Sequence, residues 1–380
     1  MNTPASKSPL VTDWTITVPV VALVALLFSW GRDLPGVALA LVSLCLAGAV
    51  LAAVHHAEVV ALRVGEPFGS LVLAVAVTTI EVALIVTLMA DGGEKTSSLA
   101  RDTVFAAIMI TCNGIVGLSL LVGALRNRVA VFNLEGAGAA LATIATLATL
   151  SLVLPTFTTT TPGPEFSSGQ LAFAATASLA LYGLFIAVQT VRHRDYFLPV
   201  DTKRIRAEKV RKAAAAVADG EEDHAQPPST RAAVLSLGLL AVALVAVVGN
   251  AKAVSPAIEA GVASAGLPQA AVGVIIALLV LLPETLAAVR AARRDRMQTS
   301  LNLAYGSAIA SIGLTVPAIA LASIWLTGPL VLGLAAIHML LLTLTVVVSA
   351  LTIVPGRATL LQGGVHLVLF SAFLFLAVSP

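Results

Sequence analysis

Long apolar stretches, each about the length of a membrane helix, alternate with short polar breaks along the chain. A helix needs roughly 20 apolar residues to cross the hydrocarbon core of a bilayer. This rule predicts about eleven spans. They cover approximately 15–31, 36–62, 67–90, 102–125, 135–155, 170–191, 232–254, 267–289, 300–323, 326–353 and 359–378. The predicted fold class is therefore an all-α polytopic membrane protein.

Composition supports this class and excludes several others. The chain is 58% hydrophobic and 11% charged, with a mean hydropathy of +0.98, whereas soluble domains carry about 25% charged residues. Cys45 and Cys112 lie inside apolar stretches, which predicts small buried side chains and not a disulfide or a metal site. The sequence contains no phosphate-binding GxxxxGK[ST] loop, no Cys/His metal cluster and no nucleophile elbow, so we expect neither an enzyme nor a cofactor.

A charged stretch at 192–231 divides the chain into an N-terminal membrane half, 1–191, and a C-terminal membrane half, 232–380. The first part of this linker is basic and rich in alanine, which indicates a helix. The second part is acidic and rich in proline, which is typical of a flexible tract. A regulatory helix responding to calcium or pH is an alternative interpretation of the linker.

Lys and Arg placement predicts the orientation. With the linker in the cytoplasm and alternating loops, 18 of the 22 Lys and Arg residues fall on the cytoplasmic side, as the positive-inside rule requires. The N-terminus is then cytoplasmic and the C-terminus extracytoplasmic. Spans 2–6 and 7–11 form two five-helix repeats of inverted topology, with span 1 as an extra N-terminal helix.

Two glutamates lie deep inside apolar spans of opposite direction. Glu81 is about 14 residues into its span, or roughly 21 Å at 1.5 Å per residue, and Glu284 is about 17 residues into its own. A carboxylate at bilayer depth costs several kcal/mol and indicates function by default. One glutamate from each half predicts one shared cation and proton site, with both carboxylates as metal ligands.

Polar residues accompany these glutamates. Thr78 shares a helix face with Glu81, and Pro283 withholds a backbone hydrogen bond beside Glu284, which would free a carbonyl oxygen. A simple packing kink is the other interpretation of the proline. The spans that follow carry candidate neutral ligands, namely Asn113 in the first half and Ser307 and Ser311 in the second. The same side chains could instead join helices by hydrogen bonds.

Histidines offer a separate hypothesis. His55, His56 and Glu58 lie near the predicted cytoplasmic end of span 2, where a pH sensor or proton path is conceivable. An interfacial polar cluster that extends to water is the alternative that we favour for the two histidines. His338 and His366 each stand alone in an apolar stretch, which predicts core histidines with satisfied hydrogen bonds.

Three stretches resemble the paired α-repeats of the calcium:cation antiporter superfamily, specifically the bacterial calcium/proton (sodium/proton) antiporters of the ChaA type. They are GEPFGSLVLAVAVTTIEVALI, MITCNGIVG and LLPETLAAVRAARRDRMQTSLNLAYGSAIASIGLTVP. The resemblance implies repeats at about 55–117 and 267–317 and a location in the bacterial plasma (inner) membrane. It also implies that Glu81 and Glu284 are the central acidic pair, with Asn113, Ser307 and Ser311 on partner helices.

The sequence departs from one part of that pattern. Vacuolar relatives have a Gly-Asn-Ala run before each acidic residue, whereas this chain has Val77-Thr78-Thr79 and Val280-Leu281-Leu282. Fewer side-chain oxygens would therefore flank the two carboxylates. This difference bears on the selectivity for calcium more than on the exchange mechanism.

These observations predict a secondary active antiporter that exports calcium in exchange for protons. Sodium or potassium exchange at the same site is the alternative. The expected partners are membrane lipid, small cations and protons, with no nucleic acid. Two rival hypotheses are a passive cation channel and a non-transport protein, either a scaffold or an intramembrane enzyme. High conductance would favour the channel. Glutamate substitutions that change only the stability of the protein would favour the non-transport protein.

Overall fold

The structure, a computed structural model, describes residues 12–32, 34–65, 68–92, 96–200, 228–268, 270–326 and 328–379. Eight helices in these ranges are long and apolar enough to cross a membrane, or nine when a bent pair counts as one span. Two shorter apolar helices, Trp14–Ser29 and Ala74–Ala90, lie where the first and third spans were predicted. The all-α membrane fold is confirmed, and every predicted range contains helix.

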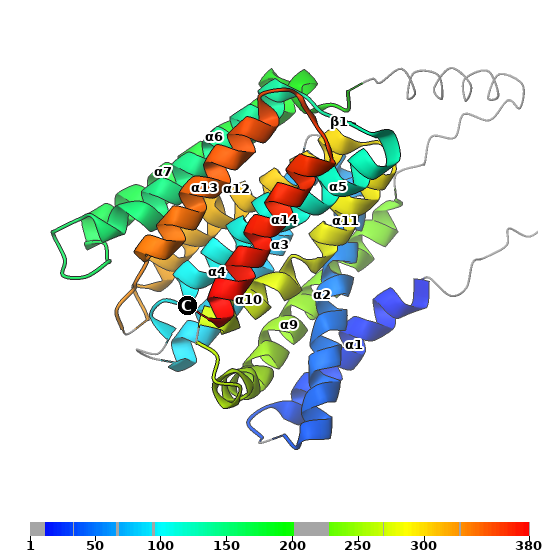
Figure 1. The fold of residues 1–380 in the computed structure, drawn as a ribbon. Coiled ribbons are helices and arrows are strands. Elements are labelled where there is room, and N and C mark those ends of the chain that lie inside the picture. Colours follow the sequence, from blue (N-terminus) through cyan, green and yellow to red (C-terminus); the bar gives the residue numbers. More distant parts are fainter. Residues whose placement is uncertain are drawn as a thin grey trace, which may run out of the picture. The chain divides into compact units, whose positions relative to one another are not determined.

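The chain folds into two compact units, each of which takes helices from both halves of the sequence (Figure 1). The first unit, Met1–Asp91 with Pro227–Gly266, contains α1 (Thr12–Ser29), α2 (Gly36–Val64), α3 (Phe68–Gly92) and α9 (Thr230–Ser264). The second unit, Gly92–Gln226 with Leu267–Pro380, contains α4 (Leu99–Met109), η2 (Ile110–Ile115), α5 (Val116–Asn127), β1 (Ala130–Val131), α6 (Leu134–Ala148), η3 (Thr149–Val153), η4 (Leu154–Thr156), α7 (Ser168–Ala187), η5 (Val188–Arg192), η6 (Arg194–Phe197), α10 (Ala270–Val280), α11 (Leu282–Arg293), α12 (Met297–Ala322), α13 (Ala336–Ile353), β2 (Arg357–Ala358) and α14 (Leu360–Val378).

This grouping differs from the division of the sequence at the linker, which stays a prediction. Most of the predicted linker, residues 201–227, lies outside the described residues.

Close helix approach holds the first unit together. α1 packs on both α2 and α9, and α2 packs along α9. Glycine makes the approach possible, because a Cβ at Gly249 would lie 2.4 Å from the Leu26 methyl groups. Asn250 then donates from Nδ2 to the Ala22 carbonyl oxygen at 2.8 Å, which joins α9 to α1 through a polar contact in an apolar interface.

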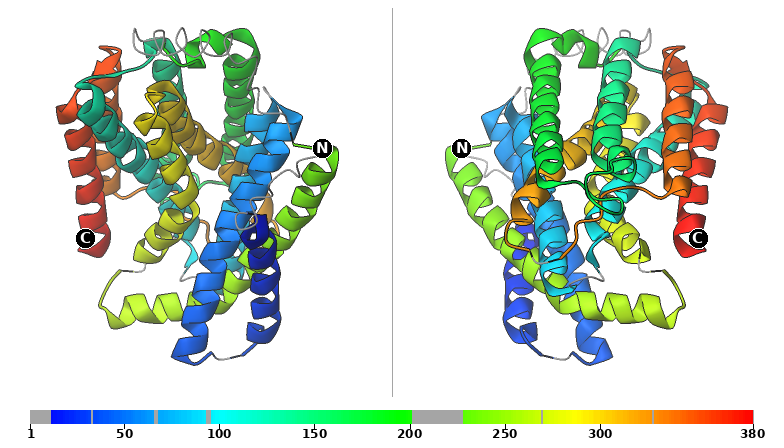
Figure 2. Two further views of the ribbon diagram at one scale, coloured as in Figure 1. Left: turned by 90° about the vertical axis from the view of Figure 1, so that its right-hand side faces the viewer. Right: turned by 90° about the vertical axis from the view of Figure 1, so that its left-hand side faces the viewer.

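The length of α9 corrects one predicted boundary. The seventh span was expected to end near residue 254, where AKAVSPAIEAG was interpreted as a break, but α9 continues to Ser264 with Pro256 inside it. A proline costs one backbone hydrogen bond and bends a helix without having to end it. The alanine-rich flanks favour helix on both sides, and Figure 2 shows the last turns of α9 running at an angle to the rest.

The second unit is built around the continuous helix α4–η2–α5, which is almost entirely buried. α10 packs on α4, α11 and α14 pack on α5, and α12 contacts all three segments of this central helix. α7, α6, α13 and α14 form a row in which each helix packs on the next (Figure 1). The C-terminal helix α14 at the end of this row also packs on α5 and η2 of the central helix.

The start of α13 corrects a second boundary. The tenth span was predicted from residue 326, but α13 begins at Ala336. The preceding backbone bonds to loops, with N–H groups of Val331, Gly333 and Leu334 donating to carbonyls of Ser97, Pro164 and Leu152 at 2.8–3.1 Å. Pro329 and Gly333 explain why this apolar stretch is not helical, since proline removes a donor and glycine weakens helix.

Two short strands join separate loops of the second unit. β1 pairs antiparallel with β2, in the register Ala130 with Ala358 and Val131 with Arg357. Phe132 extends this ribbon by donating to the Gly356 carbonyl at 3.1 Å. The loop between α5 and α6 is thereby fastened to the loop between α13 and α14.

Candidate functional site

Glu81 lies on the buried face of α3 in the first unit. Its side chain is 5% exposed, and Thr78, one turn earlier, is 4% exposed. Thr79 faces elsewhere, because it is exposed and its hydroxyl donates to the Val75 carbonyl at 2.7 Å. The helix therefore presents one carboxylate and one hydroxyl together on its buried side, as the spacing in the sequence predicted.

Glu284 lies at a break between two helices of the second unit. α10 ends at Val280, α11 begins at Leu282, and the two helix axes differ by 52°. Pro283 occupies the first turn of α11, where its missing N–H costs no hydrogen bond. The break expected from this proline is present.

The break also sets the local field at Glu284. Its half-buried carboxylate sits in the first turn of α11, where the unpaired N–H groups of a helix N-terminus favour negative charge.

Asn113 lies in a π-helical segment, η2, which interrupts the α-helix between α4 and α5. Its side chain is fully buried and donates from Nδ2 to the Thr345 hydroxyl at 2.9 Å. Its amide oxygen faces Nδ1 of His366 at 3.1 Å. Single π turns are rare and frequently mark functional positions, and no sequence signal separated this turn from ordinary α-helix.

The predicted serines lie on α12. Ser311 is 2% exposed and Ser307 is half-buried. One turn further on, the buried Thr315 hydroxyl has no hydrogen-bond partner among the described residues. α11, η2 and α12 all contact one another, so the second unit brings together the elements that carry Glu284, Asn113 and the serines.

The histidine cluster at the end of α2 spreads over different environments. His56 is buried, and its Nε2 lies 2.8 Å from the Thr15 carbonyl oxygen. The half-buried His55 ring lies 6.0 Å from the Trp14 ring, whereas Glu58 is exposed. Their role in pH sensing stays a prediction.

The two isolated histidines have different surroundings. Both ring nitrogens of His366 have partners, so the expectation of a satisfied core histidine is confirmed for it. The His338 ring packs against the Phe105 ring in a tilted arrangement, with ring centroids 5.0 Å apart. Its buried Nδ1 atom has no hydrogen-bond partner among the described residues, so the expectation of satisfied hydrogen bonds is wrong for His338, because its ring packs on an apolar neighbour.

An ion pair that the sequence argument missed begins α4. Arg101 bonds to Asp102 through both Nε and Nη2 at 2.8 Å, and Ser98 donates to the other Asp102 oxygen at 2.9 Å. Arg101 also donates to the Gly333 carbonyl at 3.3 Å. An acidic residue in the first turn after a serine is the signal that could have identified this group.

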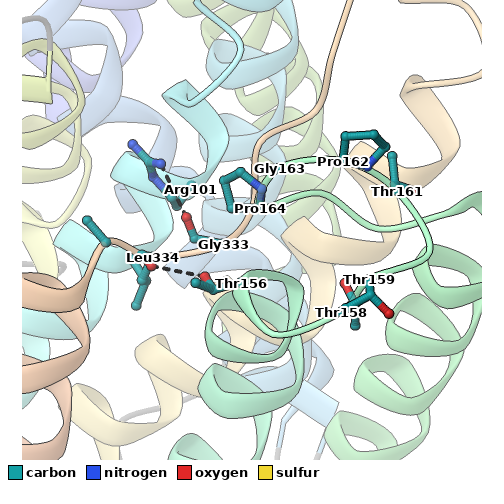
Figure 3. A pocket seen from close by; sticks show the side chains of 11 residues that line it. Arg101, Thr156, Thr158, Thr159, Thr161, Pro162, Gly163, Pro164, Gly333 and Leu334 are labelled. Carbon is teal, nitrogen blue, oxygen red and sulfur yellow. Dashed lines mark hydrogen bonds between the residues drawn. The ribbon is translucent and has the colours of Figure 1, made fainter.

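Arg101 lines a cavity of about 590 Å³ between the loop that precedes α7 and the segment that precedes α13 (Figure 3). Thr156 anchors one wall by donating to the Leu334 carbonyl at 2.9 Å. The remaining lining is threonine-rich, from Thr158, Thr159 and Thr161. None of the predicted site residues lines this cavity.

Comparison with known proteins gives extensive matches. The family described as "Sodium/calcium exchanger protein" matches residues 34–191 and 235–379. y4hA of Sinorhizobium fredii is 45% identical over 381 residues, covering 98% of both chains. The sodium-potassium/proton antiporter ChaA of Escherichia coli is 35% identical over 367 residues, covering 95% of both. A Ca(2+)/H(+) antiporter of Aphanothece halophytica is 24% identical, covering 85% of this chain and 86% of the relative.

Solved structures share the fold. Native YfkE superposes with a TM-score of 0.67 at 15% identity, covering 97% of this chain and 99% of the other. The H+/Ca2+ exchanger CAX superposes with a TM-score of 0.65 at 16% identity, covering 95% of this chain and 86% of the other. The fold described above is therefore the fold of these exchangers.

Proposed function

The chain belongs to the sodium/calcium exchanger protein family and is a transporter, not an enzyme; we propose that it exports calcium in exchange for protons. The observation that carries this proposal is Glu284 at a helix break, on an element that contacts those of Asn113 and Ser311. Carboxylate, amide and hydroxyl oxygens are the ligands that a hard cation prefers. Broken helices that carry such groups are how transporters build cation sites.

The sequence predicts Glu81 as the second carboxylate of the cation site, and the proposal keeps that prediction. An ionised carboxylate in apolar surroundings is costly, so two of them demand either a cation or protons. In this mechanism one divalent cation or two protons neutralise Glu81 and Glu284, and the two kinds of cargo compete. Because the empty, doubly ionised state is unfavourable, the carrier reorients only when loaded, which couples the two fluxes.

Sodium or potassium is the second candidate cargo. The Escherichia coli relative, 35% identical, is a sodium-potassium/proton antiporter by name, whereas the relative named for calcium is 24% identical. The residues before the two glutamates offer few side-chain oxygens, since Val77 and Val280-Leu281-Leu282 are apolar. A site with fewer ligands suits a monovalent ion better than it suits calcium.

A multi-pass location in the bacterial inner membrane accompanies this function. Exposed arginines gather in the last turns of α5 and α11 and in the α5–α6, α11–α12 and α13–α14 connections that follow, namely Arg126, Arg128, Arg290, Arg293, Arg294, Arg296 and Arg357. Arg126 donates to the Arg293 carbonyl, which joins the C-terminal ends of α5 and α11. We place this arginine-rich face in the cytoplasm by the positive-inside rule. In cells, cysteines introduced at Arg357 and Gly163 into a variant lacking Cys45 and Cys112 test this: a membrane-impermeant thiol reagent should label only position 163.

Proton flux in proteoliposomes tests the function. Vesicles with an acidic lumen receive calcium, sodium or potassium outside, and a pH-sensitive dye follows the gradient. We expect one cation to collapse the gradient, Glu81→Gln and Glu284→Gln to abolish the collapse, and Glu135→Gln, which changes an exposed glutamate on α6, to leave it intact. Flux unchanged by both site variants would contradict the proposal, and currents far above carrier turnover would favour a channel.

A further inference from the structure

A chain of buried polar side chains crosses the second unit from α13 to α14 by way of η2. Thr345 and Thr352 lie on α13, Asn113 on η2 and His366 on α14. All four are at most 3% exposed. The bonds run from Thr345 to Asn113 at 2.9 Å, from Asn113 to His366 at 3.1 Å and from His366 to Thr352 at 3.2 Å. Each member is therefore satisfied inside an otherwise apolar interface.

The donors and acceptors in this chain can be assigned. Thr345 lies 3.6 Å from Met109 Sδ and donates to it, which leaves the Thr345 oxygen to accept from Nδ2 of Asn113. The atom of Asn113 that faces His366 is thus the amide oxygen, an acceptor, so Nδ1 of His366 carries the proton. In a neutral imidazole the other nitrogen is an acceptor, so Nε2 of His366 accepts a hydrogen bond from the Thr352 hydroxyl.

Tight packing holds His366 in place. A Cβ at Gly117 would lie 3.0 Å from Cβ of His366, and one at Gly363 would lie 2.7 Å from the Leu121 backbone nitrogen. Gly114, next to Asn113 in η2, lies against the Phe370 ring. Glycines thus let α14 approach η2 and α5 closely enough for a short imidazole to reach the amide.

The hydrogen bonds of this chain do not use the full acceptor capacity of the Asn113 amide oxygen. A carbonyl-type oxygen has two lone pairs, and His366 uses one of them. The amide plane is fixed from both ends by Thr345 and His366, which sets the direction of the second lone pair. Since η2 contacts α11, the element that carries Glu284, that direction matters for any cation bound there.

We propose that His366 is a positioning residue: its Nδ1–H holds the Asn113 amide oxygen in the orientation that ligates the transported cation. The inference rests on the proposed function. It differs from the simpler interpretation, in which His366 only fills and satisfies the α13–α14 interface. Partners that orient a ligand typically change metal affinity by about 10–100-fold when they are removed.

A matched pair of substitutions separates these interpretations. His366→Asn keeps an amide N–H close to the position of Nδ1, and His366→Gln reaches the position of Nε2 instead. We expect His366→Gln to raise the KM for the cation by about 10-fold or more, with a smaller change in maximal rate, and His366→Asn to stay within about threefold of wild type. Thr352→Val, which removes only the outer hydrogen bond, should behave like His366→Asn.

A double-mutant cycle completes the test in proteoliposomes. Asn113→Ala should raise KM at least as much as His366→Gln does. Adding His366→Gln to Asn113→Ala should raise KM little further, because His366 acts through Asn113. Equal KM values for His366→Asn and His366→Gln, or fully additive effects on KM in the double mutant, would overturn the positioning role. The proposed function would still stand if wild-type protein exchanges the cation for protons and Glu284→Gln does not. Wild-type protein that exchanges no cation for protons would overturn both. Size-exclusion profiles and melting temperatures identify variants that do not fold.

Discussion

Neighbouring glycines near the start of α14 provide a sharp test of the packing that supports the site. A Cβ at Gly363 would meet the Leu121 backbone nitrogen at 2.7 Å and the Gly117 carbonyl oxygen at 3.1 Å. Both are backbone atoms of α5, so neither can rotate away. At Gly364 a Cβ would meet nothing within 4 Å.

The expected magnitudes follow from these surroundings. Alanine gains up to about 1 kcal/mol over glycine in a helix, and this gain is nearly the same at two adjacent positions. Overpacking costs about 1–3 kcal/mol and applies to Gly363→Ala alone. Gly364→Ala should therefore match or exceed wild-type stability, and Gly363→Ala should be less stable than Gly364→Ala by about 1–3 kcal/mol.

Thermal unfolding of the detergent-solubilised protein measures the difference. At about 2 °C per kcal/mol for a chain of this size, Gly363→Ala should melt about 2–6 °C below Gly364→Ala. It should also raise the KM for the cation, because α14 must move outward and carries His366 one turn away. Equal melting temperatures for the two variants would refute the close approach of α14 to α5.

Three further predictions concern other parts of the structure. Pro283→Ala allows a hydrogen bond to the Leu279 carbonyl and should straighten the 52° bend, giving a protein at least as stable as wild type with reduced exchange; full exchange activity would show that the bend is only a packing feature. Asp102→Asn leaves the partly buried Arg101 without its counter-charge and should lower stability by about 1–3 kcal/mol, measured by thermal unfolding, with Glu135→Gln as the exposed control. Because protons and the cation compete, KM for the cation should rise as pH falls, by up to about tenfold per pH unit for each proton displaced; a KM independent of pH would contradict competition at one site.

Apolar length and proline placement predicted much of the fold. The spans follow from the number of consecutive apolar residues that a bilayer requires, and the break at Glu284 follows from the missing N–H of Pro283. The same rules were wrong at Pro256, where a helix continued, and before α13, where the apolar residues are not helical. At Pro256 the alanine-rich flanks favour helix on both sides. Before α13 the backbone bonds instead to carbonyls of Ser97, Pro164 and Leu152, which are far away in the sequence.

Less of the site's detailed geometry could be predicted. The glutamates, Asn113 and the serines stand out because polar groups are rare in apolar stretches. The π turn at Asn113 has no sequence signal, since a π-helix and an α-helix use the same residues. The bond from Asn113 to His366 joins positions 253 residues apart, and a single sequence gives no information on such a pair.

The small ribbon formed by β1 and β2 limits how this protein can vary in loop length. Lengthening a loop usually costs little, because closure entropy grows slowly with length. Here an added residue in either strand would shift the pairing of Ala130 with Ala358 and of Val131 with Arg357, turning each side chain to the opposite face. Insertions in these two loops should therefore be accepted in pairs or not at all, and a single-residue change in one should select for a compensating change in the other. An epitope tag or fluorescent reporter belongs instead at the exposed Pro162 and Gly163 of the threonine-rich loop between η4 and α7, ahead of Pro164 and Glu165, whose backbone pairs with the segment before α13.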